Sequence, residues 1–193
     1  MKLVRDFYEQ PTVQVAQQLL GKYLVRVHPE GVTAGMILET EAYVGLEDKA
    51  SHASRGLTPR NAVMFGPAGF AYVYAIYGMH HCLNAVTEGE TYPAAVLIRA
   101  LQPCEALELM RGRRRKQDVR LLANGPGNLC QAFGIGRGLN GIDLCGDALF
   151  VEDRGSRPAD FAATTRVGVA YAGPWKDMPW RFYIAGHPGV SKR

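Results

Sequence analysis

The stretch Gly35-Met-Ile-Leu-Glu-Thr-Glu-Ala-Tyr43 decides how the rest of the sequence is interpreted. Its alternation predicts a strand with Glu39, Glu41 and Tyr43 on one face and Leu38, Thr40 and Ala42 on the other. Two neighbouring carboxylates on one strand face are costly to bury unless they are paired or used. Two interpretations therefore stay open. One carboxylate activates a water molecule as a general base, or both acids simply pair with arginines.

Residues 44–69 form a long loop, and long loops in compact domains are typically functional. A stretch rich in aromatic residues follows this loop. Residues 70–76 alternate as a strand, residues 77–80 turn, and residues 81–86 return, which predicts a β-hairpin. Tyr72 and Tyr74 share a face, which in an ordinary protein indicates core packing. Tyr77 and Met79 lie at the tip, where an apolar side chain can wedge between base pairs. The rings of this region are also suited to stacking on an extruded base.

The remaining pattern predicts one mixed α+β domain over residues 1–193, with a mainly antiparallel sheet and flanking helices. Pro11 suits the first turn of a helix that Gly21 ends. We expect further helices at 103–113 and 126–133, and strands at 22–27, 94–101, 149–152, 166–169 and 181–184.

Composition narrows the class of protein. The chain of 193 residues is 47% hydrophobic, ordinary for a globular protein. It has no apolar run long enough to span a membrane and no secretory signal at its start, so we expect a cytoplasmic protein. Its four cysteines form no CxxC pair and are expected to be reduced, with a metal site as the less favoured alternative. A metal cluster of Glu41, Asp48 and His52 lacks the usual tight spacing.

Charge is concentrated in one place. The formal net charge is only +4, but five arginines and one lysine crowd residues 111–120 beside the single acid Asp118. This segment is either a solvated, mobile loop or an arm that contacts phosphates.

Taken together, several runs in order resemble the alkyladenine (methylpurine) DNA glycosylase family. They are Phe7-Tyr-Glu-Gln-Pro11, Glu39-Thr-Glu-Ala-Tyr43, Thr58-Pro-Arg-Asn61, Tyr72-Val-Tyr-Ala-Ile-Tyr-Gly-Met79 with Cys82 and Asn84, Val96-Leu-Ile-Arg-Ala-Leu101, Gly125-Pro126 with Leu129-Cys-Gln-Ala132, Arg166-Val-Gly-Val169 and Arg181-Phe-Tyr183. The resemblance covers most of the chain and implies a single α+β domain with a curved antiparallel sheet and a protruding hairpin.

The resemblance also implies roles for individual residues. Glu41 matches the general base, and Arg99, with the backbone near Val190, matches the group that holds the attacking water. The walls that stack on the flipped base correspond to Tyr43, His52 and Tyr74, and Asn84 matches the residue that disfavours normal guanine. The wedge corresponds to Tyr77 with Met79 beside it. Contacts to the DNA backbone are expected from Arg60, Arg113, Arg114 and Arg115.

The expected activity is that of a monofunctional DNA glycosylase without metal or cofactor, acting as a monomer on duplex DNA. The lesions that suit the pocket are 3-methyladenine, 7-methylguanine, hypoxanthine and ethenoadenine. Lys49 is the only lysine near the Glu41 segment, and the resemblance gives it no role as a Schiff-base nucleophile, so no strand cleavage is expected. Asn128, His80 and His81 depart from the residues often found in the family, and their effect on DNA binding stays open.

Two alternatives remain. A non-catalytic DNA-binding module would keep the wedge and the arginines without needing Glu41. A hydrolase of free nucleosides would act without duplex DNA and would be indifferent to Tyr77.

Overall fold

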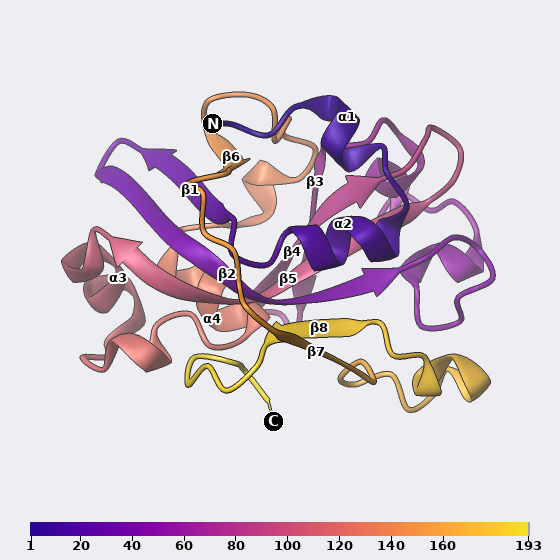
Figure 1. Ribbon diagram of the computed structural model, residues 1–193. Helices are drawn as coiled ribbons and strands as arrows, with labels where there is room; N and C mark the ends of the chain where they lie inside the picture. Colours follow the sequence, from indigo (N-terminus) through magenta and orange to yellow (C-terminus); the bar gives the residue numbers. More distant parts are fainter. Residues whose placement is uncertain (193) are drawn as a thin grey trace.

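The computed structural model describes residues 1–192 of the chain. Figure 1 shows the helices and strands in the order α1 (Arg5–Tyr8), α2 (Thr12–Gln18), β1 (Tyr23–His28), β2 (Gly31–Tyr43), β3 (Ala71–Ile76), β4 (His80–Thr87), β5 (Ala94–Glu105), α3 (Leu107–Arg114), α4 (Pro126–Ala132), β6 (Leu149–Glu152), β7 (Phe161–Thr164) and β8 (Arg181–Ile184). Short 3-10 helices lie at His52–Arg55, Ala62–Phe65, Val119–Leu121, Arg137–Leu139 and Gly173–Asp177.

One antiparallel sheet organises the molecule, so the expected α+β class is confirmed. Its main path runs β3-β4-β5-β2-β1-β6, and β8 joins β2 while also pairing with β7. The 13-residue strand β2 pairs with β5 along one side, while β1 and β8 share its other side. Because residues 39–41 pair with β5 and β8 at once, this part of β2 is interior, and Glu39 and Glu41 are both 0% exposed.

The main core lies between the sheet and its helices. Helix α2 packs on β2 and β5, and Val15, Ala16 and Leu19 are buried there because they fall on one helical face. The Thr40 hydroxyl donates to the carbonyl of Ala16 at 2.8 Å, which fixes the helix over the middle of β2. Helix α4 packs on β4 and β5.

Strand β2 is irregular where its two acids begin. The pairing of β2 with β5 shifts on both sides of Glu39. An extra residue of this kind breaks the two-residue alternation. Leu38 consequently lies against Gly189 in the C-terminal segment, where an added Cβ would be 2.8 Å from its Cδ1. The strict alternation expected for residues 38–42 is therefore wrong at Leu38, while Glu39, Glu41 and Tyr43 form one connected group.

The expected hairpin is present as β3 and β4. The turn between the paired residues Ile76 and His80 has three residues, and Tyr77 and Gly78 take the positive φ values of 49° and 72° that occur in tight hairpin turns. The tip projects into solvent, since Tyr77 is 92% and Met79 75% exposed.

One expected helix starts later than predicted, and one expected strand is absent. Pro103 does not open a helix, because β5 continues to Glu105 and α3 begins only at Leu107. Pro103 is paired with Gly35 next to a register shift, a place where a strand tolerates a residue without an amide hydrogen. Residues 166–169 form no strand, because their polar groups bond to Glu41 and Asp48 instead of a neighbouring strand. The short strand β7 pairs with β8 in their place.

The loop at residues 44–69 is ordered by its own side chains. The Asn61 amide donates to the carbonyls of His52 and Gly56 at 3.1 and 2.9 Å, and its oxygen accepts from the amide of Thr58. The loop therefore carries two 3-10 helices rather than irregular chain.

Within residues 1–192, no helix has the length and apolar character needed to cross a membrane. The four cysteines are free thiols, of which Cys82 and Cys130 are buried.

Candidate active site

A cavity of about 210 Å³ opens beside the acids of β2. Its walls come from the end of β2 and the following loop, from the hairpin, from β5, and from residues 167–171. These lining residues are Tyr43, Ala50, Ser51, His52, Met64, Tyr72, Tyr74, Ile76, Cys82, Asn84, Ala95, Leu97, Arg99, Pro126, Val167, Gly168, Val169 and Tyr171. The volume is below the roughly 300–1,000 Å³ of drug-sized pockets, so it suits a flat group of nucleobase size.

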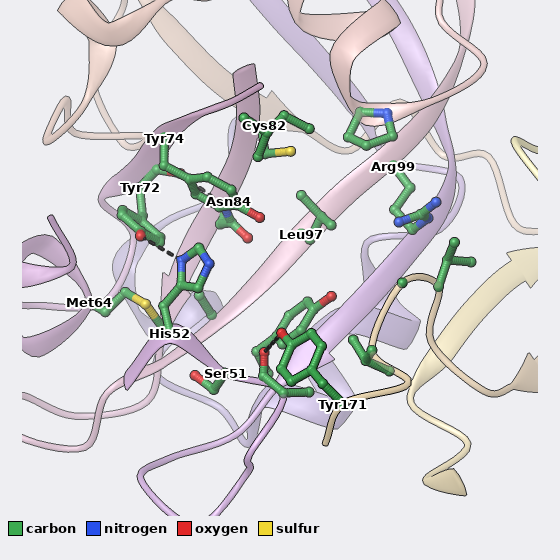
Figure 2. A pocket seen from close by; sticks show the side chains of 18 residues that line it. Ser51, His52, Met64, Tyr72, Tyr74, Cys82, Asn84, Leu97, Arg99 and Tyr171 are labelled. Carbon is green, nitrogen blue, oxygen red and sulfur yellow. Dashed lines mark hydrogen bonds between the residues drawn. The ribbon is translucent and has the colours of Figure 1, made fainter. Parts of the chain in front are cut away.

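Three rings form one wall of the cavity. Figure 2 shows Tyr72, Tyr74 and His52 together on one side, with Arg99 on the other. The ring centroids of His52 and Tyr74 are 4.6 Å apart, and those of Tyr72 and Tyr74 are 5.2 Å apart. The Tyr72 hydroxyl and the Nδ1 atom of His52 are 2.9 Å apart, a hydrogen bond that fixes the imidazole. The wall is thus rigid and presents aromatic surface, as flat bases require for stacking.

The His52 imidazole favours its neutral form. Burial lowers its pKa, and the positive charges of Arg60 and Arg55 lower it further. Burial likewise raises the pKa of Tyr72 to about 12 and that of Tyr74 well above its ordinary value. The wall therefore carries no charge near neutral pH.

Asn84 lies in β4 with its side chain buried against β3. Its amide nitrogen donates to the carbonyl of Tyr72 at 3.0 Å, so the side chain is held in one orientation while it lines the cavity. A fixed amide at this place restricts which polar groups a bound molecule can present to it.

Glu41 lies directly behind the cavity wall. Its Oε1 accepts from the amide of Val167 at 2.7 Å, and its Oε2 accepts from the Tyr43 hydroxyl at 2.8 Å and from Nη1 of Arg99 at 3.3 Å. All three partners line the cavity. These three donors hold the carboxylate in one orientation beside the cavity. Burial and the Glu41 charge in turn raise the pKa of Tyr43, which keeps its hydroxyl a donor.

Glu39 has a different environment, although it is two residues away. It accepts from Nε of Arg99 at 3.0 Å, from Nε of Arg181 at 2.8 Å and from the amide of Ser191 at 2.7 Å. Of these partners only Arg99 lines the cavity. Glu39 therefore joins β5, β8 and the C-terminal segment, whereas Glu41 faces the cavity through its partners.

Arg99 links the two acids. Burial alone would lower its pKa, but the charges of Glu41 and Glu39 raise it, so the guanidinium is charged. Its Nη2 donates to the Ser191 hydroxyl at 3.3 Å. This contact and the bond from Ser191 to Glu39 bring the backbone next to Val190 toward Arg99, in agreement with the expected proximity of these two groups.

A second hollow of about 470 Å³ adjoins the cavity and shares Ser51, His52 and Tyr171 with it. Lys49, Arg55 and Arg60 line it and no acidic side chain does. Arg60 lies over the Tyr74 ring, 5.4 Å from its centroid, and donates to the carbonyl of Ala75 at 3.1 Å. Arg60 therefore braces the hairpin beside this positively charged hollow.

The arginine-rich segment is more ordered than a mobile loop. Arg113 lies in α3, where it pairs with Glu30 at 2.6 Å, and Arg114 donates to Gln131 and to the carbonyl of Leu122. Arg115 ends the helix with a φ of 51° and is exposed. Of the three arginines in this segment that are expected to contact DNA, Arg113 and Arg114 thus have partners within the protein.

The hairpin tip faces the start of α4 across a shallow groove lined by Ile76, Tyr77, His80 and residues 125–128. Gly127 allows this approach, since an added Cβ would lie 3.2 Å from the His80 ring. The Asn128 amide donates to the Asn124 side chain at 3.0 Å. His81 lies at the base of the tip, paired with Ala75.

The three candidate metal ligands have other partners. Asp48 pairs with Arg166, His52 with Tyr72, and Glu41 with the donors described above. In residues 1–192 no three His, Cys, Asp or Glu side chains are grouped so as to hold a metal ion.

Several site residues are not assigned by the sequence. Val167 lies within the segment 166–169, expected to be a strand, and Tyr171 follows that segment. For Tyr72, the sequence pattern indicates only that the side chain lies on one face of a strand. Alternation with Tyr74 is a signal for Tyr72, but nothing in the sequence places residue 167 against residue 41.

Known proteins are similar to this chain along nearly its whole length. The family model described as methylpurine-DNA glycosylase (MPG) matches residues 6–188. A protein of Methanocella arvoryzae is 55% identical over 193 residues, covering 99% of this chain and 96% of that protein. A protein of Alkaliphilus oremlandii is 43% identical, and the match covers 100% of this chain and 100% of that protein. A protein of Desulfitobacterium hafniense is 45% identical, and the match covers 98% of this chain and 98% of that protein. All three carry the name "Putative 3-methyladenine DNA glycosylase". The chain thus belongs to the methylpurine-DNA glycosylase family, DNA-repair hydrolases that act on N-glycosyl bonds.

Proposed function

We propose that this enzyme is a monofunctional DNA glycosylase that flips a damaged purine into the cavity and hydrolyses its bond to deoxyribose with a water activated by Glu41. The observation that carries the proposal is the buried Glu41 carboxylate, whose three donors all line an aromatic cavity of nucleobase size. The enzyme works as one domain of residues 1–193, as a monomer, and needs no metal or cofactor for this reaction.

The flipped base stacks between Tyr43 on one side and His52 and Tyr74 on the other. The neutral state of His52 supports this role, because its pKa is lowered. The His52 backbone meets the base edge, and Asn84, fixed on the carbonyl of Tyr72, excludes the exocyclic amine of normal guanine.

The chemistry follows from one carboxylate and one arginine. Oε1 of Glu41 accepts a single hydrogen bond from Val167, so one of its two acceptor positions is left for a water. Glu41 takes a proton from that water, and the oxygen forms a bond to the sugar C1′ atom. The bond from C1′ to the purine nitrogen breaks, and its electrons leave with the base. Arg99, with the backbone near Val190, holds the water beside Glu41.

Lesion choice follows from the leaving group and from the cost of flipping. An alkylated or protonated purine departs more easily, and a weakly paired base costs less to extrude. The substrates are 3-methyladenine, 7-methylguanine, hypoxanthine and ethenoadenine. Lys49 lines the neighbouring hollow rather than the cavity, which supports base release without strand cleavage.

Duplex DNA is held by the exposed hairpin tip and by cations. Tyr77, with Met79 beside it, fills the space that the flipped base leaves. Arg60 and the arginines at 113–115 contact phosphates. Arg60 lies at the positively charged hollow next to the cavity, and Arg115 is exposed.

The test is base release from duplexes that each carry one of the four lesions, followed by analysis of the strand. Release of the free base with an intact abasic strand is the expected result. Cleavage of the DNA strand without added alkali would contradict the monofunctional mechanism. Release from free nucleosides, unaffected by Tyr77→Ala, would show a nucleoside hydrolase instead, and tight lesion binding without release would show a binding module.

A further inference from the structure

A fully buried ion pair lies just outside the cavity. Asp48 and Arg166 are 118 positions apart in the chain, and both side chains are 0% exposed. The guanidinium bonds both carboxylate oxygens, with Nη2 to Oδ1 at 2.8 Å. It also donates to the carbonyls of Ala42 and Trp175 at 2.9 and 3.1 Å. Few charged pairs are this completely enclosed, because desolvation is costly.

Two aromatic rings flank the same guanidinium. Its central carbon lies 4.8 Å from the centroid of Tyr43 and 5.1 Å from that of Trp180. Tyr43 is itself a cavity wall and donates to Glu41. Arg166 therefore packs on one face of the Tyr43 ring and supports it.

The pair joins two loops that both line the cavity and that pack against each other, since Ala50 and Val169 share one buried cluster. Asp48 also accepts from the amides of Val44 and Ala50, which shapes the loop leading to His52. Arg166 immediately precedes Val167, whose amide bonds Glu41. One contact thus fixes both loops and one of the three donors to Glu41.

We propose that the Asp48–Arg166 pair is a positioning element for catalysis, holding Val167, Tyr43 and the loop before His52 in the geometry that Glu41 needs. The inference rests on the proposed function. A displacement of about 1 Å at a reacting group can cost roughly 100-fold in rate, so a stacked, bidentate arginine is needed where a flexible lysine would not suffice.

The experiment compares Arg166→Lys and Asp48→Asn with the wild-type full-length protein. The probe is a duplex with one hypoxanthine, and each protein is assayed at a fixed interval below its own melting temperature. We expect single-turnover release at saturating enzyme to fall about 10- to 100-fold in both variants. The Kd for the same duplex is expected to stay within about threefold, because the hairpin and the surface cations are unchanged.

A spectroscopic readout is available in the free protein. The chain has only two tryptophans. Trp180 stacks on Arg166, and the carbonyl of Trp175 accepts from it. Both variants should therefore change tryptophan emission before any DNA is added.

The control is Lys22→Met, which breaks a largely buried pair of Lys22 with Asp153 at 2.7 Å away from the cavity lining. It should lower stability but leave the release rate and the emission unchanged. Wild-type rates in Arg166→Lys and Asp48→Asn, or an equal loss in Lys22→Met, would overturn the inference.

If a variant fails to fold, Trp180→Leu removes one ring while keeping the ion pair and should still slow release several-fold; an unchanged rate would overturn the inference. Failure of the proposed function is distinct, because the wild type would then release no base.

Discussion

Glu39 and Glu41 show how two identical side chains on one strand acquire different roles. Glu39 bonds two arginines and the Ser191 amide, so its negative charge is neutralised by structural partners. Glu41 has one arginine, one hydroxyl and one amide, all at the cavity. The open alternative from the sequence, acids paired with arginines, describes Glu39 fully and Glu41 only in part.

Glu39→Gln should destabilise the fold strongly. The amide cannot accept from Arg99, Arg181 and Ser191 as the carboxylate does, and two buried guanidinium groups lose their counter-charge. We expect a loss of about 3–5 kcal/mol in the free energy of unfolding, measured by urea denaturation. Glu105→Gln, which breaks a partly exposed pair with Arg154, serves as control and should cost less than about 1 kcal/mol. Equal effects of the two changes would contradict the structural role of Glu39.

Arg60→Ala should raise the pKa of His52. After burial, the Arg60 charge is the next cause that lowers this pKa. An NMR titration of the imidazole measures the shift, and Arg115→Ala is the control without effect. Because the pKa of His52 is lower in the folded protein, the unfolded chain binds more protons than the folded protein near pH 6.5. The contribution of His52 to the free energy of unfolding therefore falls as the pH drops below that value. Arg60→Ala should lessen that acid loss, and an unchanged pKa would contradict the electrostatic account.

For individual side chains, the sequence indicates which residues are candidates but not which partners they contact. Tyr43, Tyr74 and Asn84 are candidates from the sequence and line one cavity, and the candidate Glu41 bonds to residues of that lining. Asp48 and Arg166 give no signal of their pairing, because contact between residues 118 apart depends on the folded path of two loops.

Among the elements, the hairpin is predicted closely, since alternation and turn residues are local signals. The helix expected at 103–113 is present but begins only at Leu107, because Pro103 fits both a helix start and an irregular strand position. The strand expected at 166–169 is wrong because its polar groups bond side chains of other segments. In both cases tertiary contacts, absent from any local window, decide the outcome.

The hairpin tip should contribute to DNA binding and not to folding. Tyr77 is 92% exposed, so Tyr77→Ala should change the free energy of unfolding by less than about 0.5 kcal/mol. Affinity for a lesion duplex should fall at least several-fold, measured by fluorescence anisotropy. Tyr77→Phe keeps the ring and should retain most of the affinity. Unchanged affinity in Tyr77→Ala would show that the tip is not the wedge.

For the whole molecule, the modest net charge of +4 means that DNA binding depends on where cations gather. Removal of one arginine that binds a phosphate should reduce the slope of log K against log salt by about 1. We expect this for Arg60→Ala and Arg115→Ala on undamaged duplex. Arg157→Ala, an exposed arginine paired with Asp153, is the control and should leave the slope unchanged. If the slopes for Arg60→Ala and Arg115→Ala equal that for Arg157→Ala, the DNA lies on another surface.

The measurement that tests the central claim most directly is single-turnover release of hypoxanthine from duplex DNA by wild type and Glu41→Gln, with the Kd of each for the same duplex. Glutamine keeps the size of the side chain but cannot take a proton from water. We expect that release is lost in Glu41→Gln while the Kd stays within about threefold. Release at the wild-type rate by Glu41→Gln, or loss of binding together with loss of release, would contradict the assignment of Glu41 as the base.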